Sequence, residues 1–168
     1  AEGLDVPVVL LAWDTRELAD FHARKDASAI ERTFLWQGDA RMLVSIVKSV
    51  EDWRNAEHDT GAVGVQVIIL VEDNVRYYSS VLPVMYTELL HHSQRVIEEG
   101  LNLSQKILRM RARPKILLCT NWEEAEAAFE HAIRLNPQLF EAHYFCARDA
   151  FARGDLERQV GHHLTLAV

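Results

Sequence analysis

The sequence predicts an α/β protein in which a parallel sheet of four short strands with flanking helices is followed by a helical hairpin. Four apolar runs of four to seven residues alternate with stretches of helical spacing, as expected for parallel strands joined by helical crossovers. The most apolar run, residues 65–71, has the near-continuous pattern of a strand buried on both faces. From residue 121 onward no strand pattern occurs, and Asn136-Pro137 separates two helical stretches.

Composition limits the classes of function. The 168 residues are 49% hydrophobic and 26% charged, which is typical of a globular chain. The formal net charge of −7 provides no electrostatic footprint for nucleic acid or an anionic membrane, so we expect neither as a partner. No apolar run approaches the length of a membrane span. Cys119 and Cys146 form no C-x-x-C pair, and this usage fits a reducing, cytoplasmic location.

The first two strands are predicted near the amino terminus. The apolar run 8–13 is closed by Asp14-Thr15 and leads into a helix over residues 16–29. Residues 33–36 combine β-branched and aromatic side chains and predict the second strand. Helical spacing then recurs at Met42, Ile46, Val50 and Trp53.

The third and fourth strands flank a long helical region. The third strand ends at the sequence Glu72-Asp73-Asn74, and residues 76–113 are largely compatible with helix. Gly100 is the expected break in that region, and Pro83 is expected to kink the helix or delay its start. Residues 115–120 predict the fourth strand, and Asn121 is a suitable N-cap for a helix beginning at Trp122. We therefore expect an α/β domain over 1–120 and a helical segment over 121–168.

The third strand carries a resemblance to a known family. The sequence VIILVEDN resembles the first strand of a response-regulator receiver domain, a flavodoxin-like fold in which an acidic pair after this strand holds Mg²⁺. The resemblance implies that Glu72 and Asp73 are metal ligands. Mg²⁺ prefers oxygen ligands, and ligands of open α/β sheets bind outside the carboxyl ends of the strands. The alternative is a solvated turn whose acidic residues only cap the next helix.

Residues 1–60 resemble the carboxyl half of a receiver. VPVVLLAWD looks like its fourth strand and TFLWQGD like its fifth. Ala12 stands where the family has a hydroxyl residue, and Gln37-Gly38 stand where it has Lys-Pro. No strand ending in the phosphate-accepting aspartate is found. The resemblance therefore implies a degenerate module that is not phosphorylated.

Residues 65–120 resemble the amino half of a receiver, with the long helical region found in receiver modules of bacterial proteins related to phosphoenolpyruvate synthase. The chain is then either an excerpt across two tandem receivers or one permuted, four-stranded sheet. In the permuted sheet the strands lie in the order fourth, third, first, second. That order brings Asp14 to Glu72 and Asp73, which predicts a Mg²⁺ site of three carboxylates.

The helical segment resembles a tetratricopeptide repeat over about one and a half units. The stretch that ends at Asn136-Pro137 resembles the second helix of one unit. Gly154-Asp155 resemble the turn after the first helix of the next unit. The resemblance implies a surface for a protein partner, with His143, Tyr144 and Arg148 as the contacting residues. The motif positions are Ala125, Phe129, Ala132, Leu135, Asn136, Pro137, Ala142, His143, Tyr144 and Ala147.

Two further groups of residues have alternative interpretations. Five basic residues without acids between them either bind a phosphorylated partner or the acidic helix 123–130, or form a solvated helix face. The four tryptophans are expected to fill the core or the junction between helices and sheet. The basic residues are Lys106, Arg109, Arg111, Arg113 and Lys115.

These patterns together predict a signalling or regulatory module that acts through contact with a protein partner and is not an enzyme. One alternative is a non-catalytic regulatory excerpt of a phosphoenolpyruvate synthase-like enzyme. Another is a fused or artificial chain whose halves have no joint function.

Overall fold

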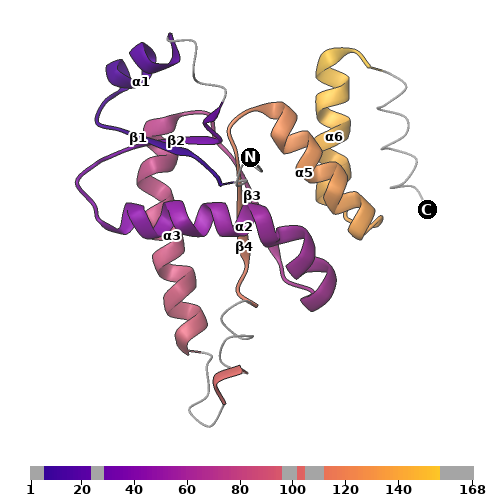
Figure 1. The fold of residues 1–168 in the computed structure, drawn as a ribbon. Coiled ribbons are helices and arrows are strands. Elements are labelled where there is room, and N and C mark those ends of the chain that lie inside the picture. The colour runs from indigo at the N-terminus through magenta and orange to yellow at the C-terminus, as the bar shows by residue number, and fades with distance from the viewer. Residues whose placement is uncertain (1–5, 24–28, 96–101, 105–111, 156–168) are drawn as a thin grey trace, which may run out of the picture. The chain divides into compact units, whose positions relative to one another are not determined.

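The computed structural model describes residues 6–23, 29–95, 102–104 and 112–155 (Figure 1). It divides into two compact units, residues 1–118 and residues 119–168. The division falls close to the boundary expected at residue 120.

Strands and helices alternate through the first unit, which makes it an α/β structure. The last strand extends one residue beyond the unit. In Figure 1, α2 crosses α3, and the two helices are in contact. The elements are β1 (Val9–Ala12), α1 (Thr15–His22), β2 (Arg32–Leu35), α2 (Arg41–Val63), β3 (Val67–Val71), α3 (Val75–Arg95) and β4 (Lys115–Cys119).

Local sequence explains where the helices begin and end. Asp14 has extended backbone angles, and its carboxylate accepts hydrogen bonds from the first N–H groups of α1. Asn74 caps α3 in the same way, through bonds from the backbone N–H groups of Arg76 and Tyr77. The helix α2 ends at Gly64, whose φ of 68° is left-handed and whose N–H donates to Thr60 O.

The predicted four-stranded, flavodoxin-like sheet is wrong. The strands form two separate two-stranded parallel sheets, β1–β2 and β3–β4, so the β1–β3 pairing needed for the permuted sheet is missing. In the first pair Val9 lies opposite Arg32 and Ala12 opposite Leu35. The two pairs run in different directions in Figure 1.

Side chains of α3 explain why no continuous sheet forms. Tyr78, Leu82 and Tyr86 lie in one buried cluster with Phe34 of β2 and Ile116 of β4. The two strand pairs are therefore joined through a helix and its large apolar side chains, and a backbone ladder between them is not required for burial. The strands have only four or five residues, so each offers few backbone hydrogen bonds to a ladder.

Two smaller expectations also differ from the structure. The strand β3 was expected to be buried on both faces, yet Ile68 and Val71 are exposed. Pro83 was expected to kink α3 or delay its start; the start is not delayed, because α3 begins at Val75 and continues past a buried Pro83. The expected break at Gly100 lies outside the described residues.

The second unit contains two helices, α5 (Trp122–Leu135) and α6 (Phe140–Arg153). Asn121 Oδ1 accepts from Glu124 N, and Glu124 Oε2 accepts from Thr120 N, which is a reciprocal capping arrangement. The rings of Phe129 and Phe145 stack at 5.1 Å between centroids. The buried side chains of the two helices are mostly small and include Ala125, Ala142, Cys146, Ala147 and Ala150.

Candidate functional site

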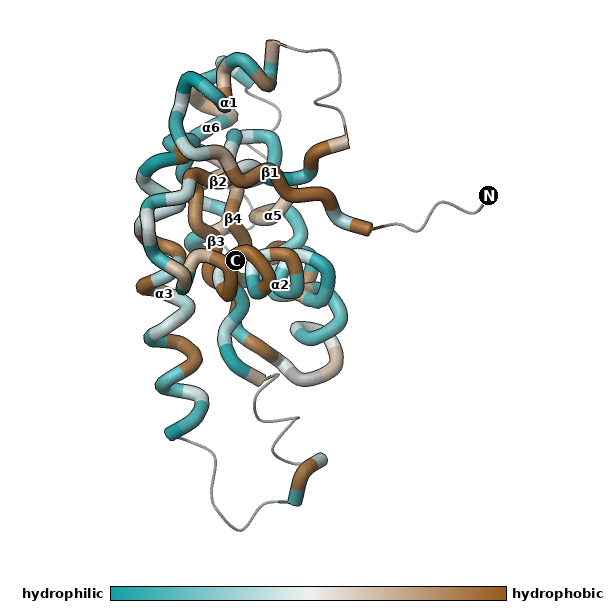
Figure 2. Tube along the Cα trace, turned by 60° about the vertical axis from the view of Figure 1, so that its left-hand side comes forward, coloured by the Kyte–Doolittle hydropathy of each residue, from teal (hydrophilic) through white to brown (hydrophobic). Residues whose placement is uncertain are grey.

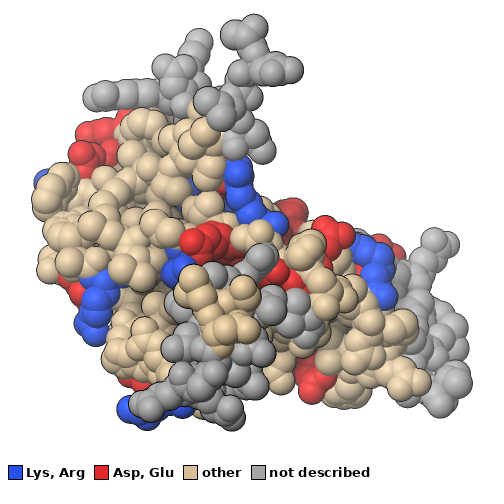
Figure 3. Space-filling model, turned by 60° about the horizontal axis from the view of Figure 1, so that its bottom comes forward, with Lys and Arg blue, Asp and Glu red and all other residues tan. Residues whose placement is uncertain are grey.

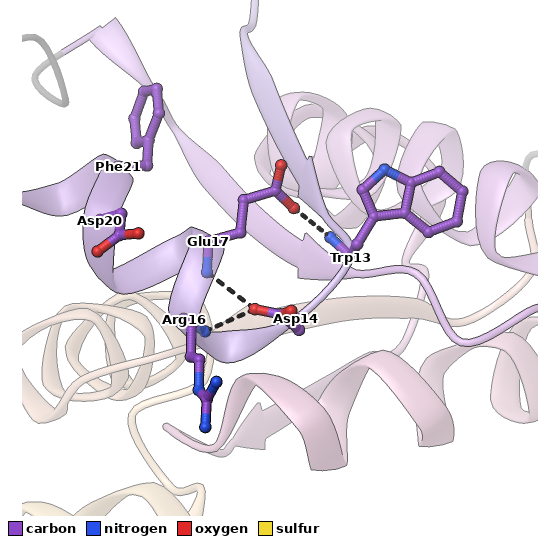
Figure 4. A pocket seen from close by; sticks show the side chains of 6 residues that line it. All are labelled: Trp13, Asp14, Arg16, Glu17, Asp20 and Phe21. Atoms are coloured by element: carbon purple, nitrogen blue, oxygen red, sulfur yellow. Dashed lines mark hydrogen bonds between the residues drawn. The ribbon is translucent and has the colours of Figure 1, made fainter.

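The carboxyl end of β1 leads directly into the first turn of α1. Asp14 Oδ1 accepts from Arg16 N and Glu17 N, both at 2.8 Å, and Glu17 Oε2 accepts from Trp13 N at 2.7 Å (Figure 4). Both carboxylates are therefore used to hold the strand–helix junction. The tryptophans were expected in the core or at the junction between helices and sheet. Trp13 lies at such a junction but is 72% exposed, and its ring meets that of Trp36 edge-on.

A surface hollow of about 560 Å³ adjoins this junction. Figure 4 shows its lining side chains, which come from the end of β1 and from α1. Carboxylates and aromatic rings both face it, and Arg16 contributes the only positive charge among the lining residues. The lining residues are Trp13, Asp14, Arg16, Glu17, Asp20 and Phe21.

The other two predicted Mg²⁺ ligands follow β3. Glu72 Oε1 accepts from Asn74 N at 2.9 Å, which places Glu72 in the turn that precedes α3. The start of α3 does lie beside the end of β1, because Val75 packs against the cluster that contains Ala12 and Leu18. No group of three or more His, Cys, Asp or Glu side chains with metal-binding geometry occurs among the described residues. The structure therefore does not assemble Asp14, Glu72 and Asp73 into a chelating set, and the Mg²⁺ site stays a prediction.

Gln37 and Gly38, which the resemblance to a receiver matched with its Lys-Pro, follow the end of β2. Gln37 Nε2 donates to Arg76 O at 2.8 Å and so connects β2 to the first turn of α3. Asp39 pairs with Arg41, and hydrogen bonds from Arg41 lower the pKa of the Asp39 carboxyl. Ala12, which the resemblance matched with the hydroxyl residue of a receiver, is buried. These residues serve the junction between strands and helices.

The carboxyl end of the basic stretch is not a surface for phosphate. Arg113 donates to both carboxylate oxygens of Asp52, and Lys115 Nζ lies 2.8 Å from Asp59 Oδ2. All four side chains are at least 94% buried. The sequence interpretation of a solvated helix face is also wrong for these two residues. Lys106, Arg109 and Arg111 lie outside the described residues.

The sequence reasoning missed the acidic partners Asp52 and Asp59. They are seven residues apart on α2, which places them on one face of the helix together with buried Ser45 and Ser49. Tyr86 of α3 adds a hydroxyl that donates to Asp52 Oδ2 at 3.2 Å. A polar stripe at helical spacing within an otherwise amphipathic helix was the available signal.

The predicted partner-binding residues of α6 separate into two groups. Tyr144 is 48% exposed and Arg148 is also exposed, as a contact surface requires. His143 is only 2% exposed, and its Nε2 lies 2.9 Å from Pro137 O, so it belongs to the interior of its unit and not to a contact surface. Its position one residue before Tyr144 turns it by about 100° around the helix.

Two aromatic residues that the sequence reasoning missed extend the exposed face of α6. Phe140 is 58% exposed and Phe151 is 70% exposed. The rings of Phe140 and Tyr144 stack at 6.2 Å between centroids. Phe140, Tyr144 and Phe151 are spaced i, i+4 and i+11, so they lie on one side of the helix. We call these three residues the α6 aromatic strip.

Neither charge nor cysteine chemistry points to a second site within the described part of the chain. On the face in Figure 3, Lys and Arg side chains lie in small separate groups among acidic and uncharged residues. Cys119 and Cys146 are free thiols, and both are buried. No helix in the described part of the chain is long and apolar enough to cross a membrane.

Comparisons with known proteins identify no relative. No protein-family model, no curated protein and no solved structure matches this chain.

Proposed function

We propose that this chain is a non-catalytic regulatory module that binds a protein partner through the α6 aromatic strip. The observation that supports this function is the exposure of Phe140, Tyr144 and Phe151 on one side of a helix whose other side is buried and which is in contact with α5. Large aromatic side chains bury much area at little entropic cost, and they are enriched among the residues that dominate binding energy.

Arg148 indicates the chemistry of the partner. It lies on the exposed side of α6, one turn after Tyr144, and its guanidinium is 5.2 Å from the ring centre of Phe145. Stacking holds a guanidinium in place and leaves its edge N–H groups available to a carboxylate. The partner segment is therefore an amphipathic helix with apolar residues at i, i+4 spacing and an acidic residue beside them.

The test is a selection of peptides on the immobilised full chain, followed by affinity measurements. We expect selected helical peptides to lose at least about tenfold in affinity for Tyr144→Ala, as is typical of a central aromatic contact. Tyr77→Ala is the matched control, because Tyr77 is an exposed tyrosine on α3 in the other unit. Arg148→Ala is expected to remove the preference for acidic residues.

Peptides that bind wild type and Tyr144→Ala equally would overturn the proposal. Thermal unfolding of each variant provides the folding control. Tyr144 is half exposed, so its truncation should change stability only slightly. Loss of binding with unchanged unfolding then reports the contact and not the fold.

A further inference from the structure

The two sides of β1 differ in how the main-chain groups are paired. Val8 O accepts from Glu31 N at 2.9 Å, and Ala12 O accepts from Trp36 N at 2.8 Å. Main-chain groups of successive residues point to opposite sides of a strand, so these even-numbered positions face β2. Val9 and Leu11 consequently direct their N–H and C=O groups away from β2. No second strand lies on that side of β1 among the described residues.

The outer side of β2, in contrast, is covered. Leu35 N donates to Ser79 Oγ at 3.0 Å, and the hydroxyl of Tyr78 donates to Thr33 O at 2.7 Å. Both side chains come from α3, which therefore replaces a neighbouring strand. Within the β1–β2 pair, the open edge is the β1 edge.

The neighbours of Val9 and Leu11 limit what the open edge can bind. Pro7 has no N–H, and the N–H of Trp13 is already donated to Glu17. The edge thus offers two donors, Val9 N and Leu11 N, with the carbonyls of the same residues between them. An extended polypeptide has donors and acceptors at this alternating spacing.

The composition of the edge favours a copy of itself. Residues 6–13, VPVVLLAW, contain no charged and no hydroxyl side chain, and Figure 2 shows β1 as a hydrophobic stretch. Native sheet edges usually carry charges or bulges that prevent pairing with another copy. Val6, Val8 and Trp13 are exposed along this segment. The edge has no charge that would favour a partner of opposite charge. A second β1 edge has the same length and the same spacing of backbone donors and acceptors.

We propose that two copies of this chain associate by antiparallel pairing of their β1 strands about a two-fold axis. Val9 lies opposite the partner's Leu11, and Leu10 lies opposite the partner's Leu10. The product is a continuous sheet in the order β2–β1–β1–β2. A two-stranded sheet is only marginally stable by itself. The dimer joins two such sheets into one sheet of four strands.

This register follows from the available donors. With Leu10 on the axis, Val9 N and Leu11 N of each copy donate to the partner's Leu11 O and Val9 O, so the donors and acceptors of both residues are used. Centring the pair on Val9 places Pro7 opposite the partner's Leu11, and its missing N–H leaves the Leu11 carbonyl unpaired. Centring it on Leu11 places Val9 opposite the partner's Trp13, whose N–H is already bonded to Glu17.

Sedimentation equilibrium on the full chain tests the association. We expect the average mass of wild type to rise with concentration toward twice that of the monomer. Val9→Pro removes an N–H from the open edge without removing a β1–β2 hydrogen bond, and it should leave a monomer. Val9→Ala is the matched control, because it shortens the same side chain and keeps the N–H. A monomeric wild type, or a dimer that persists in a folded Val9→Pro, would overturn the proposal.

Disulfide trapping of Leu10→Cys tests the register, and it also decides the question if Val9→Pro does not fold. Residues opposite each other at a non-hydrogen-bonded position have Cα atoms about 4.5 Å apart, within the range of a disulfide. Oxidation of Leu10→Cys should therefore give a covalent dimer, whereas Val44→Cys, on the exposed side of α2, should not. Absence of the Leu10→Cys dimer rejects this register. Tyr144→Ala should dimerise like wild type, because the α6 aromatic strip takes no part in the pairing of the β1 strands.

Discussion

Arg113 and Asp52 form a two-point ion pair inside the first unit. Arg113 Nη2 lies 2.7 Å from Asp52 Oδ1, and Arg113 Nη1 lies 2.9 Å from Asp52 Oδ2. Ile116 N also donates to Asp52 Oδ2 at 2.9 Å. The pair therefore connects α2 to the segment that enters β4, and its charges are satisfied by planar, parallel hydrogen bonds.

Breaking this pair should be costly. Arg113→Met leaves Asp52 buried without its main counter-charge, and we expect the free energy of unfolding to fall by about 3–5 kcal/mol. Chemical denaturation monitored by circular dichroism measures this loss. Lys48→Met is the control, because Lys48 pairs with Glu51 on the surface of α2 and its loss should cost at most about 1 kcal/mol. Equal losses for the two variants would contradict the structural role assigned to Asp52.

Tyr86 should make stability depend on pH in the alkaline range. Burial, and then the negative charge of Asp52, raise the pKa of Tyr86 above its ordinary value of 10.0. Above that pH the unfolded chain releases the phenol proton while the folded chain keeps it, so the stabilisation present below pH 10 is lost as the pH rises.

The measurement is the free energy of unfolding of wild type and Tyr86→Phe between about pH 9 and 11. The difference between the two curves should fall with rising pH by up to about 1.4 kcal/mol per unit. Subtracting the variant removes the contribution of lysines and of the exposed tyrosines Tyr77 and Tyr144. Parallel curves would show that Tyr86 titrates alike in the folded and unfolded chain.

The Mg²⁺ prediction can be tested through Trp13. This side chain is exposed next to Asp14, and the start of α3, two residues after Asp73, packs near the same end of β1. If Glu72 and Asp73 bind Mg²⁺, millimolar Mg²⁺ should change tryptophan fluorescence in a saturable way. Asp73→Asn should abolish the change, and Asp39→Asn, which alters a carboxylate paired with Arg41, should keep it. If Mg²⁺ does not change the tryptophan fluorescence of wild type, the predicted Mg²⁺ site is wrong.

Two glycines can show whether the two units unfold separately. Gly64 ends α2 in the first unit and Gly154 ends α6 in the second, and both have φ near 70°. A Cβ at either position would meet no atom within 4 Å, so the cost of alanine comes from the left-handed backbone alone, about 1–2 kcal/mol.

We expect Gly64→Ala to destabilise the first unit and Gly154→Ala the second. If the units unfold independently, thermal unfolding followed by calorimetry should show two transitions, each shifted by only one of the substitutions. A single transition that both variants lower would show that the units unfold together.

Local sequence determined several parts of this structure. The order of strands and helices, the caps at Asp14 and Asn121, and the change to helices after residue 121 follow from short-range patterns. These features depend on side chains that contact backbone groups within a few residues, so the sequence contains the interacting partners side by side. Tyr144 was named as a contacting residue only from the resemblance to a tetratricopeptide repeat, and it is exposed.

Tertiary structure decided the rest. Whether β1 pairs with β3 depends on backbone groups more than fifty residues apart, and the large side chains of α3 occupy the space between the two strand pairs instead. The sequence alone did not show that Arg113 and Lys115 are buried. The fold pairs them with Asp52 and Asp59 of α2. The burial of His143, one residue from exposed Tyr144, depends on which side of α6 meets α5. Local patterns specify elements and caps, whereas pairing partners, buried charges and open edges arise only when distant segments compete for the same surface.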